Sequence, residues 1–209
     1  MDRRALILSG IAALGLTACA TATPTSTTTG ASGGSAPAGG ATGPSGAPAQ
    51  TYTMDEIIQQ GSDALGVAAE SVGAAVQRVF QDYGEPTAYL AGEEASAALT
   101  VGARYGRGLL YMKDRPTTEV FWQGPSIGFD AGGNASRVFT LCYNLEYPDA
   151  IFRRFPGVEG SAYLVGGLGV NYQRAENIVL APIRAGVGLR LGANVGYLTY
   201  SRQRNILPF

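Results

Sequence analysis

The stretch Arg184-Ala185-Gly186-Val187-Gly188-Leu189-Arg190-Leu191-Gly192-Ala193-Asn194-Val195-Gly196 decides the fold class of this chain. Its residues alternate between two sets, of which one is apolar throughout and the other holds Arg184, Arg190, Asn194 and four glycines. A period of two is typical of a strand with one face in a core. Glycine inside a strand costs stability and is tolerated where a sheet bends sharply, or where backbone or ligand comes close. The stretch therefore predicts a small, closely bent β-barrel.

The same period of two extends over the chain behind Pro86, where turn residues recur at short intervals. Such spacing is typical of an all-β sandwich or barrel. We expect about ten short antiparallel strands, at 87–91, 97–104, 108–113, 118–123, 126–130, 137–144, 161–170, 177–183, 185–191 and 194–200. Turns such as Gly106-Arg107-Gly108 join them, and one short helix begins at Pro148 and ends before Gly157. The predicted fold class is mainly β (α+β), a glycine-rich antiparallel barrel over residues 87–209.

Residues 51–86, ahead of the barrel, carry helical signals instead. Thr53 and Glu56 form a capping box at the start of a short helix over 54–60, which Gly61 can end. A second helix is expected from Ser62 to Gly84. Its apolar residues recur at helical spacing, at Leu65, Ala68, Ala69, Val72, Val76, Val79, Phe80 and Tyr83. A stripe of this kind predicts a helical segment packed on the barrel rather than a binding groove.

The first 19 residues have the pattern of a secretory signal. Arg3 and Arg4 precede an apolar run shorter than the roughly 20 residues that a membrane-spanning helix needs. The run ends in Leu16-Thr17-Ala18-Cys19, which resembles the lipobox of bacterial lipoproteins and implies that Cys19 is acylated. The alternative is plain cleavage after Ala20, because the flanking alanines also satisfy the small-residue rule. We expect a periplasmic protein, anchored at the outer membrane rather than the inner membrane, or else soluble.

Residues 20–50 consist almost entirely of Ala, Thr, Ser, Gly and Pro and carry no charge. Because such a segment has nothing to bury, we expect a disordered tether. The chain from 51 to 209 is long enough to fold as one domain without a disulfide or a metal ion.

Composition narrows the possible functions. The chain has no histidine, which removes the commonest general base and zinc ligand and weighs against hydrolases. If Cys19 is acylated, Cys142 has no cysteine partner, and its apolar neighbours predict a buried structural thiol. Residues 87–209 carry twelve bases and nine acids, a net charge of +3 that is too small for a nucleic-acid-binding protein. We expect no cofactor and no metal.

Two groups of residues are candidates for a site. Arg184, Arg190 and Asn194 share one face of 184–196, which is either exposed to solvent or lines a cavity that binds an anionic head group. Glu93-Glu94 is the other candidate, because this acid pair could form a carboxylate dyad with Asp130. A solvated loop is the better interpretation of the acid pair.

Several blocks of sequence carry a family resemblance. They lie at 52–57, 83–86, 92–96, 122–133, 160–163 and 182–198, and the longest begins Trp122-Gln123-Gly124-Pro125-Ser126-Ile127-Gly128-Phe129-Asp130. In order and spacing they resemble the EipA-like envelope-integrity proteins over essentially the whole of 51–209. The resemblance implies a soluble periplasmic β-barrel with helical decoration, needed for envelope integrity and without an assigned enzymatic activity. The glycine-rich strands have a fainter likeness to the SYLF lipid-binding modules.

Five residues of the longest block match the family residue by residue: Trp122, Gly124, Pro125, Phe129 and Asp130. We interpret them as structural, with Gly124-Pro125 breaking or bending a strand and the two aromatic rings packing on either side of it. A platform that contacts a ligand is the alternative.

The leading functional hypothesis is a non-enzymatic envelope protein that binds an anionic lipid or glycan-lipid, or a protein partner of the envelope. The alternative is a structural scaffold lipoprotein without a small ligand. A peptidoglycan- or lipid-active enzyme that uses Glu94 and Asp130 is the third hypothesis.

Overall fold

The computed structural model describes residues 49–185 and 196–205, except for the side chains of 97–101 and 126–134. These residues fall within one compact unit. Its elements are α1 (Met54–Leu65), α2 (Ala69–Tyr83), β1 (Ala88–Met112), β2 (Thr118–Tyr143), the 3-10 helix η1 (Pro148–Ile151), β3 (Arg154–Pro156), β4 (Tyr163–Val165), β5 (Leu168–Val170), β6 (Gln173–Ala175), β7 (Ile178–Ala185) and β8 (Tyr197–Ser201). All of the strand pairs are antiparallel. The predicted fold class is confirmed.

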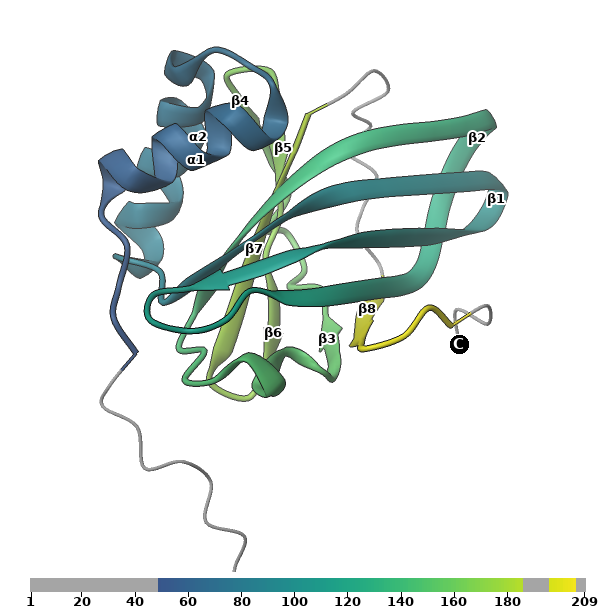
Figure 1. Cartoon of the computed structure of the whole chain (residues 1–209). Coiled ribbons are helices and arrows are strands. Elements are labelled where there is room, and N and C mark those ends of the chain that lie inside the picture. The colour runs from purple at the N-terminus through teal and green to yellow at the C-terminus, as the bar shows by residue number, and fades with distance from the viewer. Residues whose placement is uncertain (1–48, 186–195, 206–209) are drawn as a thin grey trace, which may run out of the picture. The chain divides into compact units, whose positions relative to one another are not determined.

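The largest feature is a ribbon made of the two long strands β1 and β2. They pair from Ala88 with Cys142 to Leu110 with Thr118, and the register shifts once, between Ser96 and Ala98. Figure 1 shows both strands running away from the helices, bending, and returning beneath themselves. Each strand therefore has two arms, and for β1 we call residues 88–96 the first arm and 102–112 the second arm.

Six of the expected strands merge in this ribbon, so the strand bounds predicted between 87 and 144 were wrong. The expected turn at Gly106 is also wrong, because Gly106 lies in β1 and pairs with Trp122. Pairing likewise continues through Gly124 and Pro125, so these residues do not interrupt β2. Glycine occurs both in turns and where other atoms pack closely against the backbone. At Gly106 and Gly124 the reason is close packing.

The two arms of β1 meet at a pair of glycines. A Cβ atom added to Gly92 would lie 2.2 Å from the carbonyl oxygen of Arg107 and 2.7 Å from the Cα of Gly108. A Cβ atom on Gly108 would lie 2.5 Å from the carbonyl oxygen of Ala91. The backbones of the first and second arms thus touch directly. We call this line of contact the seam.

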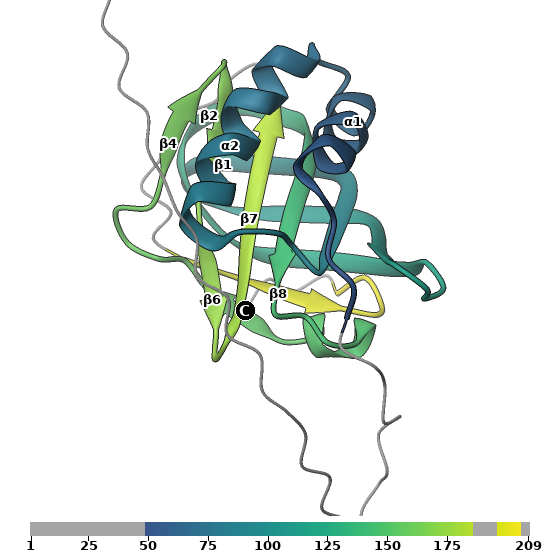
Figure 2. The same ribbon diagram turned by 90° about the vertical axis from the view of Figure 1, so that its left-hand side faces the viewer.

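The other strands close the barrel on the side away from the seam. The sheet runs in the order β3-β8-β2-β7-β5-β4, with β1 paired to β2 and β6 paired to β7. An isolated bridge between Gly157, directly after β3, and Gln173, at the start of β6, links the β3 end of this path to β6 and so to β7. Figure 2 shows β7 and β6 crossed by β8 at this side of the molecule, with α1 and α2 in front.

Alternation along the strands divides the apolar side chains between two cores. Phe139 and Leu141 of β2 point outward and pack with α1, α2, β5 and β7. Val138 and Cys142 point into the barrel, where they join Trp122 and other side chains of β1, β3 and β8. Cys142 is a fully buried free thiol, as predicted.

The helices confirm the capping box and correct the first helix boundary. Thr53 accepts a hydrogen bond from the Glu56 amide, and Glu56 reaches back to the Thr53 backbone. Helix α1 continues through Gly61 and ends at Gly66, whose φ of 66° is left-handed. Gly61 does not end the helix. It is a glycine because a Cβ there would lie 2.9 Å from Val72 and 3.1 Å from the Phe139 ring.

Helix α2 begins at Ala69 rather than Ser62, and it buries the predicted stripe from Val72 onward. Val72, Val76 and Val79 are fully buried in the outer core, and Phe80 and Tyr83 pack at its margin. Leu65 is buried as the last residue of α1, but Ala68 and Ala69 are exposed, so the stripe is core except at these two residues.

Smaller differences concern the C-terminal third of the barrel. The strand expected at 161–170 is two strands, because Gly166 and Gly167 take positive φ between β4 and β5. The expected helix after Pro148 is only the four-residue η1, and the short strand β3 that follows it was not expected. The strand expected at 177–183 is β7, and the one at 194–200 is represented by β8. Residues 186–191, like the signal and most of the tether at 1–48, lie outside the described residues.

We expect Gly92→Ala to lower the free energy of unfolding by about 2 kcal/mol or more, because the new methyl group would overlap backbone rather than a movable side chain. Gly73→Ala is the matched control, since the nearest atom there is the Ile58 Cδ1 at 3.7 Å and α2 gains a better helix former. Chemical denaturation of both variants measures the difference. Equal stabilities would contradict the close contact at the seam.

Candidate functional site

A buried ion cluster lies inside the barrel next to the seam. Glu94 comes from the first arm of β1, and only 4% of its surface is exposed. The Arg184 Nε of β7 lies 3.0 Å from the Glu94 Oε1, and the Arg184 Nη2 lies 3.3 Å from Oε2. The Arg104 Nε, from the second arm, lies 3.3 Å from the same Oε1. One carboxylate therefore joins both arms of β1 to β7.

The cluster extends to an indole and an amide. Trp122 Nε1 donates a hydrogen bond of 2.9 Å to Glu94 Oε2, and Arg184 Nη1 donates to the Asn171 side-chain oxygen. The indole has room because its pairing partner is Gly106, where a Cβ would lie 2.0 Å from the ring. The Asn171 Nδ2 and the Arg104 Nε are buried without a hydrogen-bond acceptor among the described residues.

The pKa directions show how the charges are balanced. Burial on its own would raise the pKa of Glu94, but Arg184 and Arg104 and the bonds from Arg184 and Trp122 outweigh it and lower the pKa. Burial would lower the pKa of Arg184, and its close pairing with Glu94 raises it instead. For Arg104, burial and the neighbouring positive charge of Arg184 together outweigh the attraction of Glu94 and lower the pKa. Two guanidinium groups face one carboxylate, which leaves one surplus positive charge.

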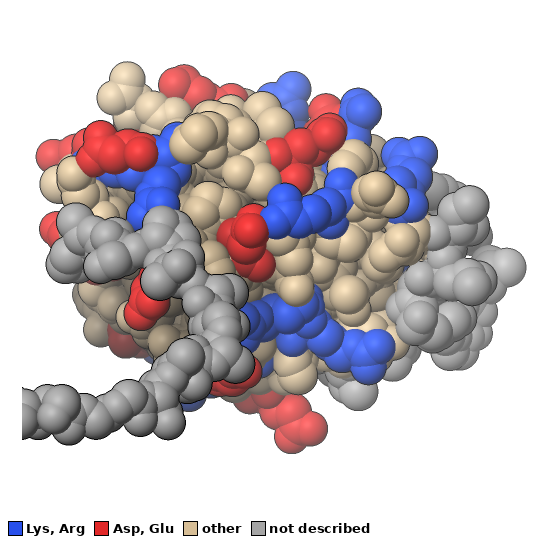
Figure 3. Space-filling model, turned by 60° about the horizontal axis from the view of Figure 1, so that its bottom comes forward, with Lys and Arg blue, Asp and Glu red and all other residues tan. Residues whose placement is uncertain are grey.

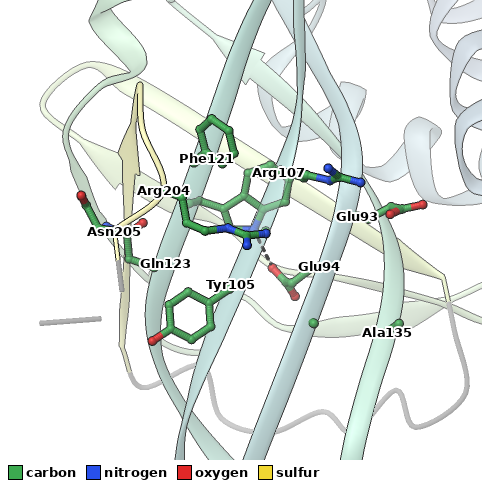
Figure 4. A pocket seen from close by; sticks show the side chains of 12 residues that line it. Glu93, Glu94, Tyr105, Arg107, Phe121, Gln123, Ala135, Arg204 and Asn205 are labelled. Atoms are coloured by element: carbon green, nitrogen blue, oxygen red, sulfur yellow. Dashed lines mark hydrogen bonds between the residues drawn. The ribbon is translucent and has the colours of Figure 1, made fainter. Parts of the chain in front are cut away.

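A pocket of about 350 Å³ opens between the arms of β1 and reaches this cluster. Its lining residues are Glu93, Glu94, Ala95, Tyr105, Gly106, Arg107, Phe121, Trp122, Gln123, Ala135, Arg204 and Asn205. Figure 4 shows the Arg204 side chain across the pocket, with the Phe121 ring on one side of it and the Tyr105 ring on the other. We call this the seam pocket.

Two exposed arginines stand at the seam pocket, Arg107 from the second arm and Arg204 from the segment after β8. Among the described residues neither of them forms an ion pair. By contrast, the end of the barrel near η1 and β6 presents mixed charges, as Figure 3 shows. Arg153 there pairs with Glu176, and Arg202 pairs with Asp149. The seam pocket is thus lined by Arg107, Arg204 and two carboxylates, and Arg104 and Arg184 behind Glu94 give its surroundings an excess of positive charge.

Comparisons with known proteins identify a family and a similar solved structure. The model of the family "Envelope integrity protein A" (EipA) matches residues 50–209. The chain belongs to this family. Among solved structures, a beta-barrel-like, uncharacterised protein from Brucella abortus is similar at 45% sequence identity, with a TM-score of 0.69, over 76% of this chain and 99% of that one. No curated protein matches.

Membership of the EipA family confirms the resemblance found in the sequence, and the Brucella structure supports the barrel. In the part of the chain that the structure describes, no helix is long and apolar enough to cross a membrane. The same residues contain no group of three histidine, cysteine, aspartate or glutamate side chains that could hold a metal ion.

The structure places only some of the predicted site residues. Arg184 is buried with partners of its own, so a contact with a ligand stays a prediction for it. Arg190, Asn194 and Cys19 lie outside the described residues, and so do the side chains of Phe129 and Asp130. The structural interpretation of Trp122 agrees with its place in the inner core. Gly124 lets β8 pass, because a Cβ there would lie 2.1 Å from the Tyr197 carbonyl oxygen.

The expectation that Glu93 and Glu94 form a solvated loop was wrong, because both residues lie in β1, where Glu93 is exposed and Glu94 is buried. Glu94 has the same parity along β1 as the buried Leu90, so it points into the barrel once the strand extends past residue 91. That parity was the available signal. Arg104 and Arg107 were missed because the bend of the ribbon places the second arm of β1 beside the first. Arg204 was missed because the segment after β8 reaches the pocket from a distant part of the sequence.

Glu94→Gln should destabilise the fold by about 3–5 kcal/mol at neutral pH, because it leaves two buried guanidinium groups without a counter-charge. Glu93→Gln, at the exposed neighbouring residue, is the control and should change stability by about 0.5 kcal/mol or less. Urea denaturation followed by tryptophan fluorescence measures both, since Trp122 is the one tryptophan of the chain.

The same pair of variants tests the pH dependence. The pKa of Glu94 is lowered on folding, so its stabilisation is fully present above the ordinary value of 4.5 and is lost as the pH falls through the folded-state pKa. The parent protein and Glu93→Gln should therefore lose stability in acid more steeply than Glu94→Gln. Parallel acid profiles for all three proteins would show that folding does not lower the pKa of Glu94.

Proposed function

We propose that this EipA-family protein is a non-catalytic protein of the periplasm that supports cell-envelope integrity by binding an anionic lipid or glycan-lipid, or an envelope partner, at the seam pocket. The family description supports the envelope role. The seam pocket carries the binding proposal, because it combines aromatic rings with two arginines that have no carboxylate partner among the described residues. Its volume lies within the range of small-molecule sites, about 300–1,000 Å³.

The chemistry of the pocket favours binding over catalysis. Glu94 is the acid at the bottom of the pocket, and its two oxygens already interact with Arg184, Arg104 and Trp122. A general acid or base must exchange a proton with a substrate. With its pKa lowered and its oxygens engaged, Glu94 is suited to hold strands and charges in place rather than to transfer protons.

We further propose that Cys19 is acylated and that residues 20–50 tether the barrel to the outer membrane. The lipobox-like end of the signal supports the anchor, and the uncharged Ala, Thr, Ser, Gly and Pro composition supports the tether. A chain cleaved after Ala20 would be soluble in the periplasm and would present the same pocket.

The pocket proposal can be tested in cells that lack the gene. Arg107→Ala/Arg204→Ala should fail to restore resistance to detergent, whereas Arg202→Ala should restore it. Arg202 is a matched control because it is an exposed arginine two positions from Arg204 that pairs with Asp149 outside the pocket. Immunoblots establish equal protein levels. Full rescue by the double variant would favour a scaffold that acts without a small ligand.

The anchor proposal has its own test. The parent chain should take up radiolabelled palmitate and remain with the membrane fraction, and Cys19→Ser should do neither. Cys142→Ser is the control for the second cysteine of the chain. Equal labelling of the parent and Cys19→Ser would exclude this residue as the anchor.

A further inference from the structure

We infer that the seam pocket binds an acidic sugar, meaning a sugar ring that carries a phosphate or a carboxylate, and that it does not bind an acyl chain. This inference rests on the proposed function and narrows its ligand. It follows from three properties of the described residues: the filled interior of the barrel, the charge around the pocket and the mixed character of the pocket lining.

The interior of the barrel is occupied by its own side chains. Leu90, Leu110, Trp122, Phe155 and Ile151 project into it from β1, β2, β3 and η1, and each is at most 2% exposed. A lipid-binding barrel instead needs an interior that leaves room for its ligand. At the inner end of the seam pocket stand the Trp122 indole and the charged Glu94, so an acyl chain there would meet a carboxylate and its polar partners rather than an apolar wall.

The charge around the pocket favours an anion. Arg107 and Arg204 stand at the pocket itself, and Arg104 and Arg184 lie behind Glu94. Against these four guanidinium groups stand two carboxylates, Glu93 and Glu94, which leaves a net charge of +2. Guanidinium groups bind phosphate and carboxylate with paired hydrogen bonds. Arg104 and Arg184 are largely buried, so water screens their positive charge less than it screens charges at the surface.

The rest of the lining suits a sugar ring. Phe121 and Tyr105 are half-buried and flank Arg204, so they offer flat apolar surface beside a cation (Figure 4). A sugar ring has an apolar C–H face and polar hydroxyl edges, and therefore matches such a surface. Glu93 and Asn205 supply acceptors and an amide for hydroxyl groups. An acidic sugar can contact the aromatic, cationic and polar groups of the pocket together, whereas an acyl chain would contact only the aromatic groups.

Titration calorimetry on the full chain, purified from its own envelope, tests the ligand class. The probes are glucose 1-phosphate, glucuronate, glucose, inorganic phosphate and hexanoate. We expect saturable binding of the two acidic sugars, each tighter than glucose or phosphate alone, and none of hexanoate. Arg204→Ala and Arg107→Ala should each weaken the binding of the acidic sugars about tenfold or more, through the loss of a charge-assisted contact. Arg202→Ala should bind as the parent does.

Phosphatidylcholine vesicles with and without a phosphorylated glucosamine glycolipid identify the source of the sugar. Binding to the glycolipid vesicles assigns the ligand to a lipid head group, and binding to the free sugars alone assigns it to a soluble glycan; both agree with the inference. Tighter binding of hexanoate than of either acidic sugar, no binding of acidic sugars, or an equal loss in Arg202→Ala would overturn it.

The outcomes separate this inference from the proposed function. If Arg107→Ala/Arg204→Ala fails to protect the envelope but the parent chain binds no acidic sugar, the ligand class is wrong and the role of the pocket stands. If acidic sugars bind and the double variant protects the envelope fully, the binding stands and the proposed function fails.

Discussion

The barrel depends on one buried carboxylate. Glu94 lies at the point where the two arms of β1 face β7, and it interacts with a guanidinium group from each side. A carboxylate without these partners would be expensive to bury, and two guanidinium groups without the carboxylate would be worse. The cluster is therefore satisfied when the ribbon is bent and its second arm lies beside the first, and it favours that arrangement. Apolar packing stabilises the barrel, and the ion cluster specifies which strands meet.

The glycines of the seam also allow the two arms of β1 to lie side by side, because they leave room for the backbone. Gly92 and Gly108 let the arms of β1 approach to backbone contact, and Gly106 leaves space for the indole that bonds to Glu94. Each of these positions is defined by an absent side chain. Just beyond the tight contact, the arms leave the space that forms the seam pocket, so the same feature that brings the arms together also positions the candidate site.

Much of the fold could be predicted from local patterns, and most of the site could not. The capping box at Thr53, the stripe of α2 and the buried Cys142 follow from spacing and composition, which are local properties. The long strands were divided wrongly because Gly106 and Gly124 look like turn residues, and only their tertiary neighbours show otherwise. The seam pocket draws on residues from 93 to 205, and no spacing rule relates such distant positions. The parity of Glu94 along β1 was the exception.

The position of β2 in the sheet has a consequence for how the chain folds. β2 pairs with β1, with β7 and with β8, and it is the strand through which the two halves of the barrel are connected. Its pairing with β1 is between chain neighbours, but Phe121 must find Ser201, near the C-terminal end of the chain. Contacts of such long sequence separation form late and slowly. The ribbon can therefore form early as a hairpin, while the closed barrel must wait until β8 is available.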